Sequence, residues 1–154
     1  MGDRPMKVLF VCHNHPAVRP GGAEQYALEL YESLRPRPEF DPYFLAWRAP
    51  IDPGLSPRHS HSVITSVNDD PNQYFIHTDH ANWHWLFERR RDKEILSRSY
   101  ADFLRSIRPD VVHFQHTLFI GYDAIRMTRN ILPDAPIVYT LHDFIPICHH
   151  HGQM

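Results

Sequence analysis

The stretch VCHNHPAVRPGGAEQYALELYESL, residues 11–34, decides the fold class. It completes a run from Lys7 to Cys12 that is rich in β-forming residues, the pattern of a parallel strand covered on both faces. After the two glycines, apolar residues recur at helical spacing, Glu24 lies in the first turn, and Pro36 ends the pattern. A strand, a Gly-Gly turn and a helix in this order predict the first unit of an α/β domain.

The rest of the chain continues the alternation of strands and helices. We predict strands over residues 42–47, 61–67, 74–77, 110–115 and 136–141, helices over 85–107 and 119–131, and polar loops over 48–60 and 68–84. This order predicts an α/β fold, a Rossmann-like open parallel sheet with helices on both faces. The chain ends soon after the last predicted strand, where such a domain next needs a helix, so we expect the domain to be incomplete at its C-terminus.

The bulk composition limits the function classes. A chain of 154 residues with 42% hydrophobic residues and a formal net charge of −2 predicts one globular domain with no affinity for nucleic acid or for anionic membranes. Cys12 and Cys148 are too few and too far apart for a disulfide framework. No apolar run is long enough to span a bilayer or to act as a signal peptide, so we expect a cytoplasmic protein.

Hydrogen-bonding side chains follow three of the predicted strands. The first strand is followed by Asn14, His15, Gly21 and Gly22, the strand at 110–115 leads to His113, Gln115 and His116, and the last strand leads to His142 and Asp143. Ligands of open parallel sheets bind at the carboxyl ends of the strands, near the point where the strand order reverses. We therefore expect these three groups to face one cleft.

The glycine pair admits two interpretations. Without Cβ atoms, Gly21 and Gly22 let the backbone approach a ligand, and the free N–H groups of the next helical turn favour a phosphate or sugar oxygen. The alternative is that the glycines only permit a tight entry into the helix. G-x-G-x-x-G is absent, and no acidic residue ends the second strand, so the sequence does not predict NAD binding.

The histidines also admit more than one interpretation. His116 and His142 could hydrogen-bond to sugar hydroxyls or to a leaving phosphate, or could be ordinary loop or core residues. His80 and His84 would share one face of a helix, with His77 and Asp79 nearby, but Asn82 and the polar approach favour a loop. The three histidines 149–151 beside Cys148 would need further ligands. The sequence thus predicts no metal site, and a metal-dependent hydrolase remains only an alternative.

Three segments together resemble the N-terminal half of the family-four glycosyltransferases, retaining sugar transferases with the GT-B fold. KVLFVCHNHPAVRPGGAEQYALELYESL is similar to the family's first strand, its P-x-x-GG-x-E loop and its first helix. RPDVVHFQHTLFIG is similar to its P-D-V-V-H segment, and PIVYTLHDFIPICHHHGQM to its T-x-H-D strand end and the following loop. Residues 48–93 match no segment of the family, and in such enzymes this region usually shapes the acceptor site.

The resemblance implies roles for single residues. Gly21 and Gly22 would lie against the sugar and diphosphate of a nucleotide-sugar donor, with Glu24 and Asp143 also at the donor. His142 would match the histidine near the transferred sugar and His116 the later histidine of the second segment, so these two are the candidate catalytic residues. Transfer would proceed with retention through an oxocarbenium-like transition state, without a metal or other cofactor, and with no nucleic-acid partner.

The resemblance also implies a larger enzyme. Residues 1–154 would be the acceptor-side domain, and the nucleotide-sugar-binding domain, which supplies most groups around the diphosphate, would lie outside this chain. The chain alone would then be inactive. The acceptor, whether saccharide, lipid or small molecule, stays open, and the full-length protein could associate peripherally with a membrane. The alternative from another class is a non-catalytic module that binds a sugar or nucleotide in the same cleft.

Overall fold

The computed structural model describes residues 4–48, 63–67, 70–85, 87, 89–144 and 146. The strands are β1 (Met6–Cys12), β2 (Phe40–Arg48), β3 (Ile64–Val67), β4 (Asp70–His77), β5 (Trp83–His84), β6 (Arg89–Arg90), β7 (Val111–Phe114) and β8 (Ile137–Tyr139). The helices are α1 (Gly22–Leu34), α2 (Lys93–Ile107), α3 (Asp123–Ile131) and the short 3-10 helix η3 (His80–Asn82). Among these helices, none is long and apolar enough to cross a membrane.

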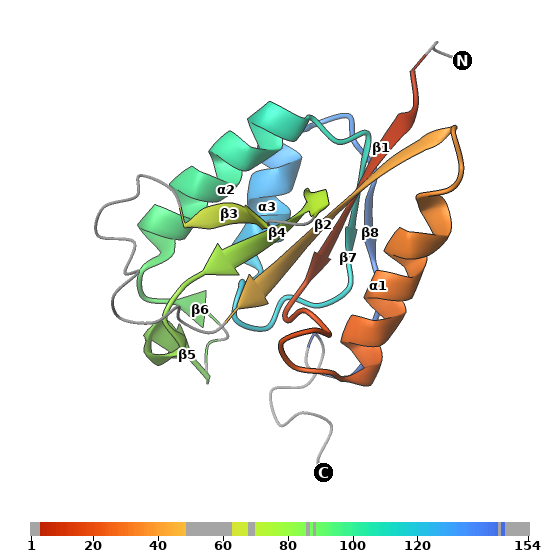
Figure 1. Cartoon of the computed structure of the whole chain (residues 1–154). Helices are drawn as coiled ribbons and strands as arrows, with labels where there is room; N and C mark the ends of the chain where they lie inside the picture. The colour runs from red at the N-terminus through yellow and green to blue at the C-terminus, as the bar shows by residue number, and fades with distance from the viewer. Residues whose placement is uncertain are drawn as a thin grey trace.

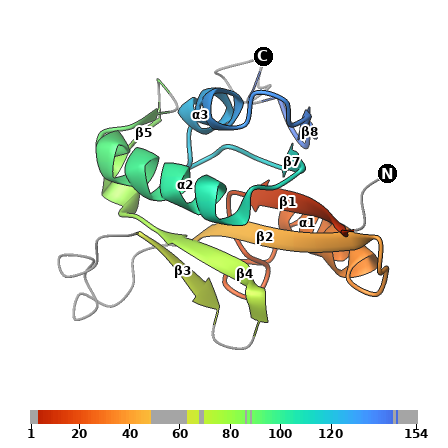
Figure 2. The same cartoon turned by 90° about the horizontal axis from the view of Figure 1, so that it is seen from above.

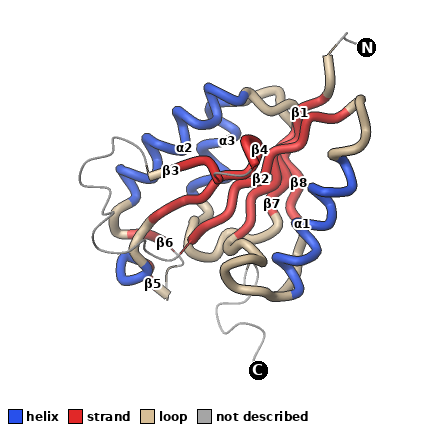
Figure 3. Tube along the Cα trace, viewed as in Figure 1, coloured by secondary structure: helices blue, strands red, loops and turns tan. Residues whose placement is uncertain are grey.

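Six strands form the central sheet in the order β3-β4-β2-β1-β7-β8 (Figure 3). The pairs β1–β2, β1–β7, β2–β4 and β7–β8 are parallel, and only β3 runs antiparallel, against β4. Helix α1 covers one face of the sheet, and α2 with α3 covers the other (Figures 1 and 2). The predicted α/β, Rossmann-like class with helices on both faces is confirmed: the sheet is mostly parallel, and β3 is an antiparallel strand at its edge.

The strand period of two divides β1 between two hydrophobic cores. Val8, Phe10 and Cys12 pack with Tyr31 of α1, and all four are at most 7% exposed. Leu9 and Val11, both fully buried, face the opposite side, where the core includes Leu96, Tyr100, Phe103, Leu104 and Ile107 of α2. β1 is therefore buried on both faces, as its continuous apolar sequence predicted.

Two helices begin later than their sequence patterns indicated. The helix predicted from residue 85 begins at Lys93, because Trp83–His84 and Arg89–Arg90 form the small antiparallel pair β5–β6 instead. The side chain of Arg90 is buried there and donates to backbone carbonyls, which a helix beginning at residue 85 would place elsewhere. The helix predicted from residue 119 begins at Asp123, since Phe119 (φ 63°) and Gly121 (φ 94°) adopt left-handed backbone conformations that end any helical run.

The segments between β2 and α2 departed most from the prediction. The short strand predicted over 74–77 is the eight-residue β4, which lies between β3 and β2, whereas the strand predicted over 61–67 begins at Ile64. Residues 61 and 62, and all but Arg48 of the loop predicted over 48–60, lie outside the described residues.

The strand order reverses at β1. From β1 the chain crosses through α1 to β2, and it later returns through α2 to β7 on the other side of β1. The carboxyl ends of β1 and β7 are therefore the switch point at which open α/β sheets bind ligands.

Candidate functional site

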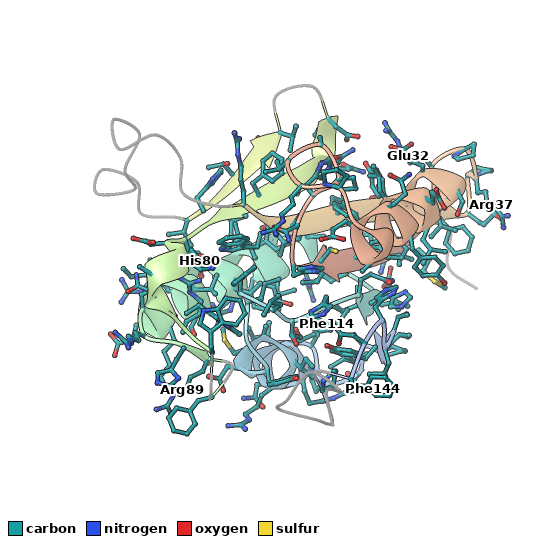
Figure 4. The ribbon with its side chains drawn as sticks, turned by 90° about the horizontal axis from the view of Figure 1, so that it is seen from below. Glu32, Arg37, His80, Arg89, Phe114 and Phe144 are labelled. Carbon is teal, nitrogen blue, oxygen red and sulfur yellow. The ribbon has the colours of Figure 1, made fainter. Side chains whose placement is uncertain are left out.

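A cleft of about 480 Å³ opens at this switch point. Its walls come from the loop after β1, the first turn of α1, the loop after β7 and the segment after β8. The lining residues are His13, Gly22, Ala23, Glu24, His116, Leu118, His142 and Asp143. Figure 4 views the molecule from the side toward which the strands run, with Phe144 close to this part of the edge.

A larger hollow of about 560 Å³ lies at the opposite edge of the sheet, at the amino ends of β1 and β7. The charged groups of its walls bond to neighbouring protein groups: Asp110 pairs with Arg4 at 2.6 Å and accepts from the backbone N–H of Lys7 at 2.8 Å, while Lys7 Nζ donates to the carbonyl of Ile107. These bonds fasten the start of β1 to the end of α2. We therefore take the cleft at the carboxyl edge as the candidate site.

Gly21 and Gly22, at the entrance of the cleft, have different structural roles. Gly21 is the N-cap of α1, and its backbone (φ −160°, ψ 167°) is extended, so conformational freedom does not explain the glycine. A Cβ there would lie 2.4 Å from Oε2 of Glu24, which is too close for any side chain unless the carboxylate moves. Gly22 has nothing within 4 Å of an added Cβ and lines the cleft. Gly21 therefore makes room for Glu24, and Gly22 leaves space open to a ligand.

Glu24 joins the helix start to the loop after β1. Its Oε1 accepts from Nε2 of His13 at 2.9 Å and from Nδ2 of Asn14 at 3.3 Å, and all three side chains are largely buried. Burial, with the nearby imidazole of His116, lowers the pKa of His13 to about 4, so His13 is neutral at pH 7. The carboxylate of Glu24 lies in the first turn of α1, where the helix dipole stabilises a negative charge.

His116 pairs with the segment after β8. Its Nδ1 accepts from the backbone N–H of Leu118 at 3.0 Å, so the proton lies on Nε2, which donates to Oδ2 of Asp143 at 2.9 Å. Its ring also lies 4.2 Å from that of His13, centroid to centroid. Both ring nitrogens of His116 thus have hydrogen-bond partners within the protein. The role of His116 in the cleft is to hold the carboxylate of Asp143 in position.

A chain of hydrogen bonds fixes the tautomer of His142. Gln115 is fully buried; its Nε2, which can only donate, contacts Nε2 of His113 at 3.0 Å, and its Oε1, which can only accept, contacts Nε2 of His142 at 2.9 Å. Thr140 Oγ1 also lies 2.7 Å from Nε2 of His113. His142 therefore carries its proton on Nε2, which leaves Nδ1 as an acceptor. Burial lowers the pKa of His142, with His116 adding to the effect, and the neutral form is favoured.

The charge of the cleft comes from carboxylates. Glu24 and Asp143 are acidic, and none of the residues that line the described cleft is Lys or Arg. Carboxylate oxygens and a neutral imidazole accept hydrogen bonds from hydroxyl groups, whereas they do not neutralise a phosphate. The described side of the cleft is therefore built for a polyhydroxylated group, with the N–H groups of the first turn of α1 as its positive element.

A model of one known protein family matches most of the chain. Residues 20–153 match the family model described as Glycosyltransferase Family 4, which spans most of the chain and includes every residue of the cleft except His13. The chain belongs to Glycosyltransferase Family 4. No curated protein matches its sequence.

In this Glycosyltransferase Family 4 chain, the three strand ends do converge, but not with all the expected residues. Gly22, His116, His142 and Asp143 line the cleft. Asn14 and Gln115 lie behind it as buried partners of Glu24 and His142, and His113 holds Gln115. His15 lies elsewhere: its Nε2 is 2.8 Å from Oε1 of Gln73, and its ring packs on Phe44 and Phe75.

The sequence analysis missed His13, which lies between His116 and Glu24. The signal was its place directly after the first strand, but the period of two that orients side chains within a strand does not extend past its end. His13 and His15 would share a face in an extended chain, whereas the turn at residues 13–19 sends them to opposite sides of β1.

The histidines that were considered as metal ligands lie away from the cleft or outside the described residues. Within the described ranges, no cluster of three or more His, Cys, Asp or Glu side chains could hold a metal ion, and His77, His80 and His84 form none. Residues 147–154, with Cys148 and the following histidines, are not among the described residues. Burial raises the pKa of Cys12 to about 12, so this thiol stays protonated and is not a nucleophile.

Proposed function

We propose that the chain is the acceptor-side domain of a retaining glycosyltransferase that uses a nucleotide-sugar donor, and that its nucleotide-binding domain lies outside residues 1–154. The observation that carries the proposal is the cleft itself: a Glycosyltransferase Family 4 chain gathers a glycine-lined helix start, two carboxylates and a neutral imidazole at its switch point. The absence of Lys and Arg from the described lining supports a partner domain that supplies the positive charge for the diphosphate.

In the proposed reaction, the bond between the anomeric carbon and the diphosphate oxygen breaks, and its electron pair leaves with the diphosphate. The acceptor hydroxyl bonds to the anomeric carbon on the same face, through an oxocarbenium-like transition state, and its proton passes to the departing diphosphate oxygen. No metal is required for this balance. N–H groups beside Gly21 and Gly22 would face the charge that develops on the diphosphate, which is the kind of preorganised stabilisation that lowers such barriers.

The side chains of the cleft would act on the transferred sugar. His142 would accept a hydrogen bond from a sugar hydroxyl through Nδ1, because Gln115 holds the proton on the other nitrogen. Asp143 would accept from a second hydroxyl, with His116 as the residue that positions it. Glu24 would order the donor loop by holding His13 and Asn14.

The test uses protein expressed from the complete gene and a panel of UDP-, GDP- and ADP-sugars, with release of the free nucleotide as the readout. Gly22→Val fills the open space beside the helix start, and His142→Ala removes the proposed acceptor of the sugar hydroxyl. Glu32→Ala is the matched control, because Glu32 lies on the exposed last turn of α1, far from the cleft (Figure 4). We expect release from one donor, retained in the control and lost in both cleft variants while their circular dichroism is unchanged.

Two other outcomes would refute the proposal. Donor binding without nucleotide release would favour the non-catalytic binding module. If the folded protein neither binds a donor nor releases nucleotide, the role of Gly22 is limited to the entry into the helix.

A further inference from the structure

A second surface lies at the same edge of the sheet, beyond the ends of β2 and β4. The ring of Phe119 lies 4.4 Å from that of Trp47, 5.1 Å from that of His80 and 5.6 Å from that of Trp85, centroid to centroid. Trp85 packs edge-on against His80 at 5.7 Å and remains 50% exposed. We call Trp85 and His80, supported from beneath by Trp47 and Phe119, the aromatic platform. His80 is labelled in Figure 4.

A buried cation holds the platform together. The side chain of Arg90 is 1% exposed; its Nη1 donates to the carbonyl of Phe119 at 3.1 Å, and its Nη2 donates to the carbonyl of Asp79 at 2.9 Å. Asp92 accepts from Nε and Nη2 at 2.7 and 2.8 Å and balances the charge. The turn that carries His80 is thereby tied to the loop that carries Phe119, so the rings are fixed relative to each other.

Phe119 is also held in an unfavourable backbone conformation. Its φ of 63° places a bulky aromatic residue in the left-handed region, which such residues rarely occupy. Strain of this kind persists where the surrounding structure enforces it, and it is concentrated at ligand clamps and active sites. Here the enforcing contacts are the bond from Arg90 and the packing of the ring against four other aromatic rings, those of Trp47, His80, Trp83 and Trp85.

The platform is continuous with the cleft through the loop after β7. Leu118 lines the cleft and donates its backbone N–H to His116, and the next residue, Phe119, supports the platform. A molecule that spans this loop would place one end beside His142 and Asp143 and the other on the exposed ring of Trp85.

We propose that the aromatic platform is a binding subsite for a sugar ring of the acceptor, stacked on Trp85. The inference rests on the proposed function, which it deepens by assigning the acceptor to the saccharides. The apolar face of a pyranose has about the size of an indole, and its C–H groups make weak attractive contacts with an aromatic face. The exposed imidazole of His80 lies edge-on against the ring of Trp85 and can hydrogen-bond to a hydroxyl group of a sugar stacked there.

The composition of the surface argues against a lipid. An acyl or prenyl chain binds by burying a long, continuous apolar surface. Exposed His80 packs edge-on against Trp85, and the guanidinium of exposed Arg89 lies over the ring of Phe87, which is itself 58% exposed, so polar groups border the exposed aromatic rings of this segment. Small aromatic faces with polar neighbours suit a ligand that is apolar on one face and polar at its edge.

The test measures sugar binding directly, by saturation-transfer NMR on protein from the complete gene. The probes are N-acetylglucosamine and the methyl glycosides and disaccharides of glucose, mannose and galactose. The variants are Trp85→Ala, Trp85→Phe, which keeps an aromatic face, and Ile95→Ala, a control that removes another exposed apolar side chain, on α2. We expect at least one probe to bind, Trp85→Ala to weaken its binding about tenfold, which corresponds to about 1.4 kcal/mol, and Trp85→Phe to restore most of it.

Three outcomes decide against the subsite. Equal binding by wild type and Trp85→Ala, or no binding of any probe by wild type, overturns it. Binding to vesicles of phosphatidylcholine and phosphatidylglycerol that depends on Trp85, without sugar binding, assigns the surface to a membrane instead. Failure of the proposed function gives a different result. If the protein releases nucleotide from no donor but still binds a sugar in a way that depends on Trp85, the subsite stands and only the transfer reaction is refuted.

Discussion

Replacing Gly21 by alanine should destabilise the protein, although the same change at Gly22 should not. The new Cβ at position 21 would lie 2.4 Å from Oε2 of Glu24 and 3.1 Å from its Cδ, so the carboxylate must turn away. Its bonds from His13 and Asn14 are then lost or weakened. The clash itself costs little once the side chain has moved, and the penalty comes from these buried hydrogen bonds.

The magnitude follows from three contributions. A hydrogen bond to a charged group contributes about 1.5–3 kcal/mol, and at least the bond between His13 and Glu24 is broken. Alanine also reduces the freedom of the unfolded chain, which offsets about 0.4–1 kcal/mol. The extended backbone at Gly21 adds no strain. We therefore expect Gly21→Ala to lower the free energy of unfolding by about 1–2 kcal/mol.

The assay is urea unfolding of Gly21→Ala beside Gly22→Ala. Gly22 is the first residue of α1 and an added Cβ there meets nothing within 4 Å, so its replacement should stabilise by about 0.5–1 kcal/mol. In a Glu24→Ala background the Gly21→Ala penalty should vanish, because the group it displaces is gone. Equal stability of the two alanine variants, or a penalty that survives in the Glu24→Ala background, would refute the placement of Glu24 against Gly21.

Three further changes test other parts of the structure. Burial lowers the pKa of His13 to about 4, so between pH 6.5 and about 4 the unfolded chain binds a proton at this residue that the folded protein excludes. Stability should therefore fall as the pH drops through this range. Thermal unfolding of His13→Gln should show a smaller decline. Arg90→Met should cost about 3–5 kcal/mol because it leaves Asp92 unpaired and two carbonyls unbonded, whereas exposed Arg91→Met should change urea stability little. Tyr100→Phe, which removes a buried bond to Thr128, should cost about 1 kcal/mol.

The fold followed from the sequence wherever local pattern and tertiary environment agreed. β1, α1 and β7 combine strong periodicity with clear ends, and the structure has them within a few residues of their predicted bounds. Residues 83–92 show the opposite case. Their charged sequence is compatible with a helix, but burial of Arg90 and Trp83 forces a short strand pair, and burial of this kind depends on partners that are distant in sequence, such as Phe119.

The sequence predicted the location of the candidate site better than it predicted the role of each residue. That strand ends converge at a switch point is a property of topology, so His116, His142 and Gly22 could be placed from the sequence. Which nitrogen of His142 is free depends on the amide of Gln115, and the need for glycine at position 21 depends on the rotamer of Glu24. Neither is encoded in spacing, because each is set by hydrogen bonds across the fold.

The bonds from Arg90 to the carbonyls of Phe119 and Asp79 join two parts of the carboxyl edge that belong to different segments of the chain. The cleft residues are carried by the loops after β1, β7 and β8, whereas the exposed rings of the platform are carried by residues 79–85. The short segment could therefore diverge, or be exchanged by design, without disturbing the groups around His142, provided that the arginine and its two carbonyl contacts are kept. Under the proposed function, such an arrangement would let the ligand bound at the platform change while the groups of the cleft stay the same.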